Sequence, residues 1–198
     1  MRTYAFLIAL LAFGLGSCNT PNFKDGDIIF QTSKSSQSPV ISKITESELT
    51  HCGIIFHKND KPYVFEAVNP VRVIPLSDWI KNGVDGKYKV VRLNYELREN
   101  HKKTMYNYAK VQMGKRYDYT FGWSDSKMYC SELVWKIYNS TGYTLCDTKK
   151  FKDYNLSSEE AKREIIHRYG SSINMDEPAV APIDIFNSDL VGLVYSNY

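Results

Sequence analysis

The stretch MYCSELVW, residues 128–135, places a cysteine at the start of a helix. Cys130 is followed by apolar residues at the spacing of one helical face, and the pattern ends at Gly142; these residues are Leu133, Val134, Ile137 and Tyr138. The free N–H groups and the dipole of a helix N-terminus favour an anion, so they lower the pKa of a thiol placed there. This position predicts that Cys130 is a nucleophile.

The helix alone cannot ionise this thiol. Lowering a thiol pKa by ~2 units takes about 2.7 kcal/mol, whereas a helix dipole supplies ~0.3 to 1 kcal/mol. A histidine must therefore supply the rest, and the chain has four. His101 and His167 lie on polar helices, and His57 lies near a turn, where exposure is expected. His51 remains as the general base, because Gly53 on the same strand face leaves room beside it.

Glu66 is the third candidate catalytic residue. Two apolar runs, 50–57 and 63–68, are separated by KNDKP and predict a hairpin. A turn centred near Asn59 brings Glu66 opposite His51 or one diagonal step away. Glu66 would then fix the tautomer of the imidazole, and the backbone N–H of Cys130 would donate to an oxyanion.

Each of these residues also has an ordinary structural interpretation. A helical cysteine is commonly a small buried apolar side chain, and a single glutamate on a strand is commonly exposed.

A metal site is disfavoured because no Cys or His spacing of the zinc type occurs, and Cys52 points to the strand face opposite His51. Cys52 and Cys146 form a disulfide or remain buried thiols; the sequence leaves both open.

The order of the elements predicts a single α+β domain. Strands are expected at 27–31, 50–57, 63–68, 71–74 and 87–94, and helices at 39–48, 75–83, 95–114, 129–142 and 157–169, with short extended pieces over 181–195. Strands and helices do not alternate strictly, which is typical of an antiparallel sheet packed against helices. The length of 198 residues is that of one domain.

The N-terminus predicts a lipoprotein signal. Arg2 precedes a short apolar run, and LGSC resembles the bacterial lipobox, in which the cysteine becomes lipidated. We therefore expect a signal peptide at 1–17, lipid attachment at Cys18, a tether at 18–23 and the domain at 24–198. An ordinary secretory signal with a chance cysteine is the alternative. The predicted location is the bacterial cell envelope, periplasm-facing or extracellular. An odd number of cysteines then remains, which leaves at least one unpaired thiol.

The formal net charge of +3 and the absence of a basic run give no support to a nucleic-acid partner.

Five segments resemble the permuted papain-like amidases of the YiiX/YebB type, within the NlpC-type group of cysteine peptidases; they are KDGDIIFQ, LTHCGIIF, YVFEAV, MGKRYDYTF and MYCSELVWKIY. The resemblance covers roughly residues 24 to 186. It implies a circularly permuted papain-like fold, in which the histidine strand precedes the cysteine helix. The order His51, Glu66, Cys130 matches that permutation.

The resemblance also implies an activity. Cys130 corresponds to the nucleophile, His51 to the base and Glu66 to the third polar residue, while Tyr117 and Tyr129 are candidates for the oxyanion or substrate-binding region. The implied reaction is hydrolysis of amide bonds in peptides, such as peptidoglycan stem peptides, through a thioester acyl-enzyme. No cofactor or metal is implied. A thioester-based acyltransferase or esterase acting on lipids, and a non-catalytic binding lipoprotein, are the alternatives.

Overall fold

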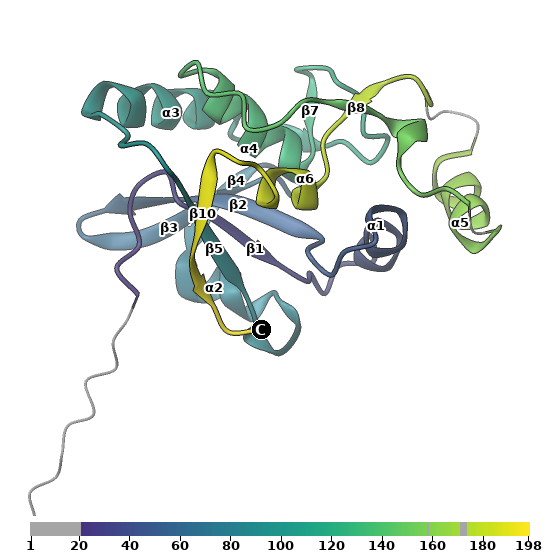
Figure 1. The fold of residues 1–198 in the computed structure, drawn as a ribbon, viewed down its shortest axis with the longest axis horizontal. Coiled ribbons are helices and arrows are strands. Elements are labelled where there is room, and N and C mark those ends of the chain that lie inside the picture. Colours follow the sequence, from purple (N-terminus) through teal and green to yellow (C-terminus); the bar gives the residue numbers. More distant parts are fainter. Residues whose placement is uncertain (1–20, 158, 171–173) are drawn as a thin grey trace, which may run out of the picture.

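The fold is built on one antiparallel sheet. The computed structural model describes residues 21–157, 159–170 and 174–198. Six strands form the sheet in the order β10 (Val191–Ser196), β5 (Lys89–Leu93), β1 (Ile28–Gln31), β2 (His51–Lys58), β3 (Lys61–Glu66) and β4 (Arg72–Pro75) (Figure 1). All of their pairings are antiparallel. The predicted α+β class with an antiparallel sheet is confirmed.

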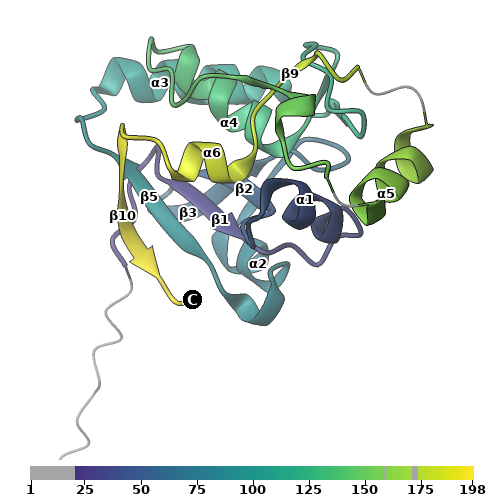
Figure 2. The same cartoon turned by 45° about the vertical axis from the view of Figure 1, so that its right-hand side comes forward.

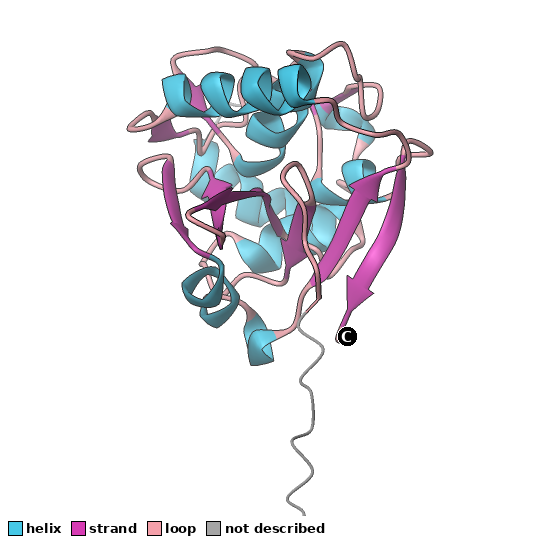
Figure 3. Cartoon of the chain, turned by 90° about the vertical axis from the view of Figure 1, so that its left-hand side faces the viewer, coloured by secondary structure: helices cyan, strands magenta, loops and turns pink. Residues whose placement is uncertain are grey.

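Helices of different lengths cover the sheet. They are α1 (Ser38–Thr45), α2 (Leu76–Lys81), α3 (Glu99–Gln112), α4 (Cys130–Asn139), α5 (Glu159–Tyr169) and α6 (Pro182–Phe186), with 3-10 turns at η1 (Val84–Gly86) and η2 (Phe151–Asp153). Two small ladders pair β6 (Arg116–Tyr117) with β7 (Lys127–Met128) and β8 (Lys149–Lys150) with β9 (Pro178–Ala179). Figure 2 shows α5 beside α1, and Figure 3 shows helices above the curved sheet. Within the described part of the chain, no helix has the length and apolar character of a membrane span.

The two faces of the sheet carry two cores, because side chains alternate along each strand. The larger core joins even-numbered residues of β1 and β2, such as Phe30 and Cys52, to Leu133 of α4. The smaller core joins odd-numbered residues such as Ile29 and Ile55 to Trp79 of α2 and other side chains. Helix α4 therefore packs on the face that carries Cys52.

The β2–β3 hairpin has the geometry expected from its sequence. Asn59 and Asp60 form the turn with φ values of 51° and 59°, as a two-residue hairpin turn with two left-handed positions requires. The register pairs Ile54 with Phe65, so Glu66 lies opposite Gly53 and one diagonal step from His51. A Cβ at Gly53 would approach Val64 Cγ1 to 2.5 Å, so a larger residue would not fit there.

Several boundaries differ from the sequence prediction. The segment 181–195 was expected to be extended, but 182–186 forms α6 before β10. Pro182 suits the first turn of a helix, and the Asp184 carboxylate accepts a hydrogen bond from the Ala181 N–H at 2.8 Å. The helix expected over 95–114 is limited to α3. The Phe23 ring packs edge to face against the Tyr88 ring, with ring centres 6.3 Å apart. Phe23, which the sequence assigned to the tether, therefore packs against the domain.

Candidate active site

Cys130 is the first residue of α4, and its side chain lies against β2. The preceding residue, Tyr129, has extended backbone angles of −102° and 168° and forms the N-cap. Cys130 is 2% exposed. Its backbone N–H has no acceptor among the described residues, as is usual for the first turn of a helix. This N–H therefore remains available to an oxyanion formed next to the sulfur.

His51 starts β2 and is held from two sides. Its Nε2 lies 2.7 Å from Glu66 Oε2, and its ring stacks on Trp79 with ring centres 5.8 Å apart. The second oxygen of Glu66 accepts a hydrogen bond from Arg72 Nε at 2.8 Å. Arg72 is the direct cross-strand partner of Glu66. These contacts fix the imidazole in a narrow range of orientations.

The charges of the site favour a thiolate and an imidazolium. A hydrogen bond from the Cys52 thiol, together with the hydrogen bond and charge of His51, holds the pKa of Cys130 well below its usual range in spite of burial. Burial lowers the pKa of His51, but Cys130 and Glu66 outweigh it and raise this pKa to about 10. The hydrogen bonds and charges of His51 and Arg72 also outweigh burial and lower the pKa of Glu66.

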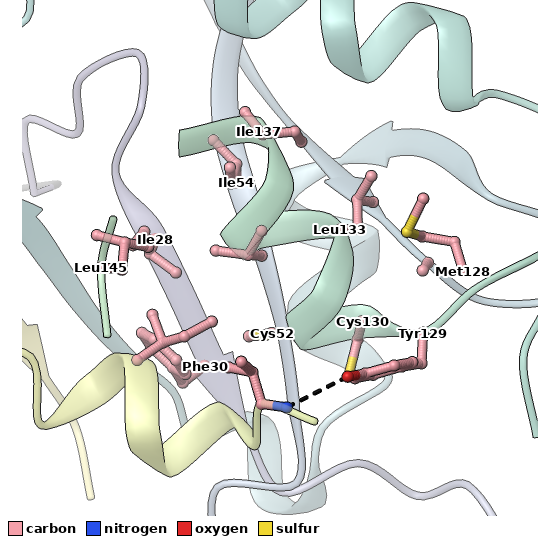
Figure 4. Packing of buried hydrophobic residues seen from close by; sticks show 14 of the residues in the cluster. Ile28, Phe30, Cys52, Ile54, Met128, Tyr129, Cys130, Leu133, Ile137 and Leu145 are labelled. Atoms are coloured by element: carbon pink, nitrogen blue, oxygen red, sulfur yellow. Dashed lines mark hydrogen bonds between the residues drawn. The ribbon is translucent and has the colours of Figure 1, made fainter. Parts of the chain in front are cut away.

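Cys52 is part of the site, which the sequence did not predict. The side chain is fully buried, and burial, followed by the hydrogen bond to Cys130 and the charge of Cys130, raises its pKa well above the ordinary value. Cys52 therefore stays a protonated thiol that donates to the Cys130 sulfur. Figure 4 shows both cysteines in the larger core beside Tyr129. Cys52 and Cys146 are both free thiols, so the disulfide alternative is not observed.

Cavities of two kinds flank the catalytic candidates. One is apolar and reaches Cys130; its walls include Ile41, Ile44, Phe121, Tyr129, Phe151 and Val180. Two others adjoin His51 instead and are more polar, with volumes of about 240 and 150 Å³. Tyr117 lines the smaller of these two, while Tyr129 lines the apolar one and its hydroxyl accepts a hydrogen bond from the Val180 N–H at 3.2 Å.

The remaining predicted positions lie elsewhere. His57 sits at the opposite end of β2, where its Nδ1 lies 2.7 Å from Asp25 Oδ1. His101 lies on α3 and packs edge to face on Tyr143. Cys18 and the predicted signal peptide at 1–17 are outside the described residues.

Comparison with known proteins gives the family. A family model described as a permuted papain-like amidase enzyme, YaeF/YiiX, C92 family, matches residues 22–195. This chain belongs to that family. The fold is accordingly a permuted papain-like one, and the family supports a cysteine amidase or peptidase class. The chain is 43% identical to the YiiX protein of Escherichia coli K12 over 164 residues, which is 82% of this chain and 81% of YiiX.

A solved structure has the same fold. The crystal structure described as metalloprotein yiiX from Escherichia coli O157:H7 has a TM-score of 0.85 and 40% identity, and the match covers 88% of this chain and 98% of that one. The described residues of the present chain contain no group of three or more His, Cys, Asp or Glu side chains that could hold a metal ion. The residues in the described part of the chain therefore do not fit a resident metal.

Proposed function

We propose that Cys130, His51 and Glu66 form the catalytic triad of a cysteine hydrolase that cleaves amide bonds in peptides, with peptidoglycan-derived peptides as substrates. The observation that carries the proposal is the packing of α4 on β2, which places Cys130 at a helix N-terminus and close enough to His51 for His51 to lower the pKa of the thiol. The 2.7 Å contact between His51 and Glu66 supports it. A nucleophile, a base and a group that orients the base are the parts that such chemistry needs.

In the acylation step, the Cys130 thiolate attacks the carbonyl carbon and forms a C–S bond. The carbonyl electrons move to oxygen, and the N–H of Cys130 donates to that oxyanion. The His51 imidazolium then gives its proton to the amide nitrogen, and the C–N bond breaks. The products are a thioester on Cys130 and a free amine, while the positive charge leaves His51.

In the deacylation step, neutral His51 takes a proton from water, and the resulting hydroxide attacks the thioester carbonyl. The C–S bond breaks, the acyl group leaves as a carboxylic acid, and the thiolate and imidazolium are restored. Glu66 stays ionised throughout and holds one ring nitrogen, so that the other can exchange the proton. Arg72 keeps this carboxylate charged, since it pairs with the oxygen that His51 does not contact.

The decisive experiment is mass spectrometry of muropeptides incubated with the wild-type chain and with Cys130→Ala. We expect new peptide fragments with the wild type only. Cys146→Ala is the matched control, because Cys146 is also a free cysteine but lines none of the cavities described above. Fragments of equal yield with Cys130→Ala would refute the proposal, and a Cys130→Ala variant that is unchanged in every assay would favour a non-catalytic binding lipoprotein.

A second candidate activity is acyl transfer or ester hydrolysis on lipids with the same triad. The apolar walls beside Cys130 favour it, and the cavity between them, at about 30 Å³, accommodates a small apolar group rather than a long acyl chain. The same preparations should be offered acyl esters. Turnover of esters alone would replace the amidase proposal, whereas turnover of peptides alone would exclude the lipid activity.

We also propose that the chain is anchored to an envelope membrane through a lipid on Cys18. The support is the LGSC sequence after a short apolar run. Cys18→Ala should prevent lipid attachment and release the protein from the membrane fraction. Unchanged processing and unchanged membrane association would show that an ordinary signal precedes the domain.

A further inference from the structure

The larger polar cavity next to His51 contains a buried side chain without a partner. Gln31 is 0% exposed, and neither its Oε1 nor its Nε2 has a hydrogen-bond partner among the described residues. Gln31 pairs directly with His51 across β1 and β2, so both side chains lie on the same face of the sheet. Buried polar groups are normally satisfied, so this amide marks the wall of the cavity as a polar one with hydrogen-bonding capacity still unused.

Gly83 leaves the space that the Gln31 amide occupies. A Cβ at Gly83 would approach Gln31 Oε1 to 2.4 Å, so any larger residue at position 83 would push the amide aside. The neighbouring loop is tied to the same place by the bridge between Ser33 and Gly83. The position of Gln31 is therefore a built feature of this wall of the cavity.

The charge of this cavity favours an anion. Its walls carry Lys34 and Arg72, and among the described residues that line it the only carboxylate is Glu66, which is already paired with His51 and Arg72. Arg72 uses Nε for Glu66, and no partner of its two Nη atoms occurs within the described ranges. Lys34 donates one of its three hydrogens to the Lys81 carbonyl at 2.9 Å. Donors on both side chains thus remain for a ligand.

The cavity also lies on a defined side of the scissile bond. His51 lines it, whereas Cys130 lines the apolar cavity instead. The group that becomes the acyl-enzyme must lie against the sulfur, and the leaving amine must lie against the imidazole that protonates it. The cavity at His51 is consequently on the leaving-group side.

We infer that this cavity binds the free carboxylate of the leaving group through Arg72 and Lys34, beside the buried Gln31 amide. The inference rests on the proposed function, because it takes His51 as the proton donor. The volume of about 240 Å³ suits a short leaving group, so the enzyme removes one or a few residues from a free C-terminus. Guanidinium and ammonium groups are the donors that proteins use for carboxylates.

Binding can be tested without turnover on the Cys130→Ala background. Alanyl-alanine and alanyl-alanine carboxamide serve as probes, and NMR titration follows the Gln31 side-chain amide signal. A charge-assisted hydrogen bond favours the acid over the carboxamide by about tenfold in Kd. Adding Lys34→Met should reduce this preference several-fold. Lys61→Met is the matched control, since Lys61 is exposed at the far end of the β2–β3 hairpin.

The outcomes separate this inference from the proposed function. Equal binding of acid and carboxamide, or a preference that Lys34→Met and Lys61→Met affect equally, overturns the carboxylate site even where peptides are hydrolysed. A preference for the acid that Lys34→Met removes supports the site, even where no peptide is hydrolysed and the proposed function fails. In active enzyme, kcat/KM should show the same preference for substrates with a free C-terminal carboxylate.

Discussion

Replacing Glu66 with glutamine tests the charge arrangement of the site most directly. The substitution keeps the shape and one acceptor oxygen but removes the charge that lies 2.7 Å from His51 Nε2. A hydrogen bond to a charged group contributes about 1.5 to 3 kcal/mol, and one pKa unit corresponds to about 1.4 kcal/mol. The pKa of His51, raised to about 10 in the wild type, should therefore fall by ~1 to 2 units.

NMR can follow this titration through the ring Hε1 signal of His51. In the wild type the signal should move near pH 10, and in Glu66→Gln it should move at clearly lower pH. The titration reports His51 and Cys130 as an interacting pair, so the comparison between variants carries the result. Glu48→Gln is the control, because Glu48 is an exposed carboxylate paired with Lys89 at 3.2 Å.

Stability should follow the same pH window. The folded pKa of His51 lies above its unfolded value of 6.5, so its ion pairs stabilise the fold fully below pH 6.5, and this contribution is lost as pH rises through about 10. The difference in unfolding free energy between wild type and Glu66→Gln should shrink toward pH 10 in urea titrations. A His51 titration within about 0.3 unit of the wild type would refute the reasoning, since such a shift corresponds to only ~0.4 kcal/mol.

Three further substitutions test separate contacts. Cys52→Ala removes a donor to the Cys130 sulfur, so alkylation of Cys130 by iodoacetamide should require higher pH; an unchanged rate profile, read by mass spectrometry, would exclude this role. Tyr129→Phe leaves the buried Val180 N–H without its 3.2 Å acceptor and should cost ~1 to 3 kcal/mol in urea unfolding, and a loss below 0.5 kcal/mol would contradict this. Burial raises the pKa of Glu132 to about 7, which should make the wild type lose about 3 kcal/mol of stability as pH rises from 4.5 to 7. Glu132→Gln should abolish that dependence, and a slope that persists would assign it to other groups.

Local patterns in the sequence were sufficient to predict the β2–β3 hairpin and the start of α4. The turn at Asn59 and Asp60 fixes the register, and the register places Glu66 one step from His51. The contact between Cys130 and His51 is a tertiary one, and only the chemical need for a base predicted it. The structure brings these two residues together because α4 packs on β2.

Other members of the site could not be predicted in this way. Arg72 lies on an edge strand, and its pairing with Glu66 depends on the register of β3 and β4, which the connecting loop does not encode in any simple pattern. Cys52 was placed correctly on the face opposite His51, yet it still contacts Cys130, because the first turn of α4 lies over that face. Alternation along a strand describes which face a side chain occupies and cannot describe what packs there.

Arg72 connects the proposed triad to the proposed carboxylate site. Its Nε holds the Glu66 carboxylate, and its side chain lines the cavity that His51 also lines. A bound carboxylate would add negative charge close to His51, and a nearby opposite charge favours the protonated imidazole. Substrate with a free C-terminus would therefore keep the proton on His51 until the leaving amine takes it. Binding of the leaving group and its protonation would then depend on the same guanidinium.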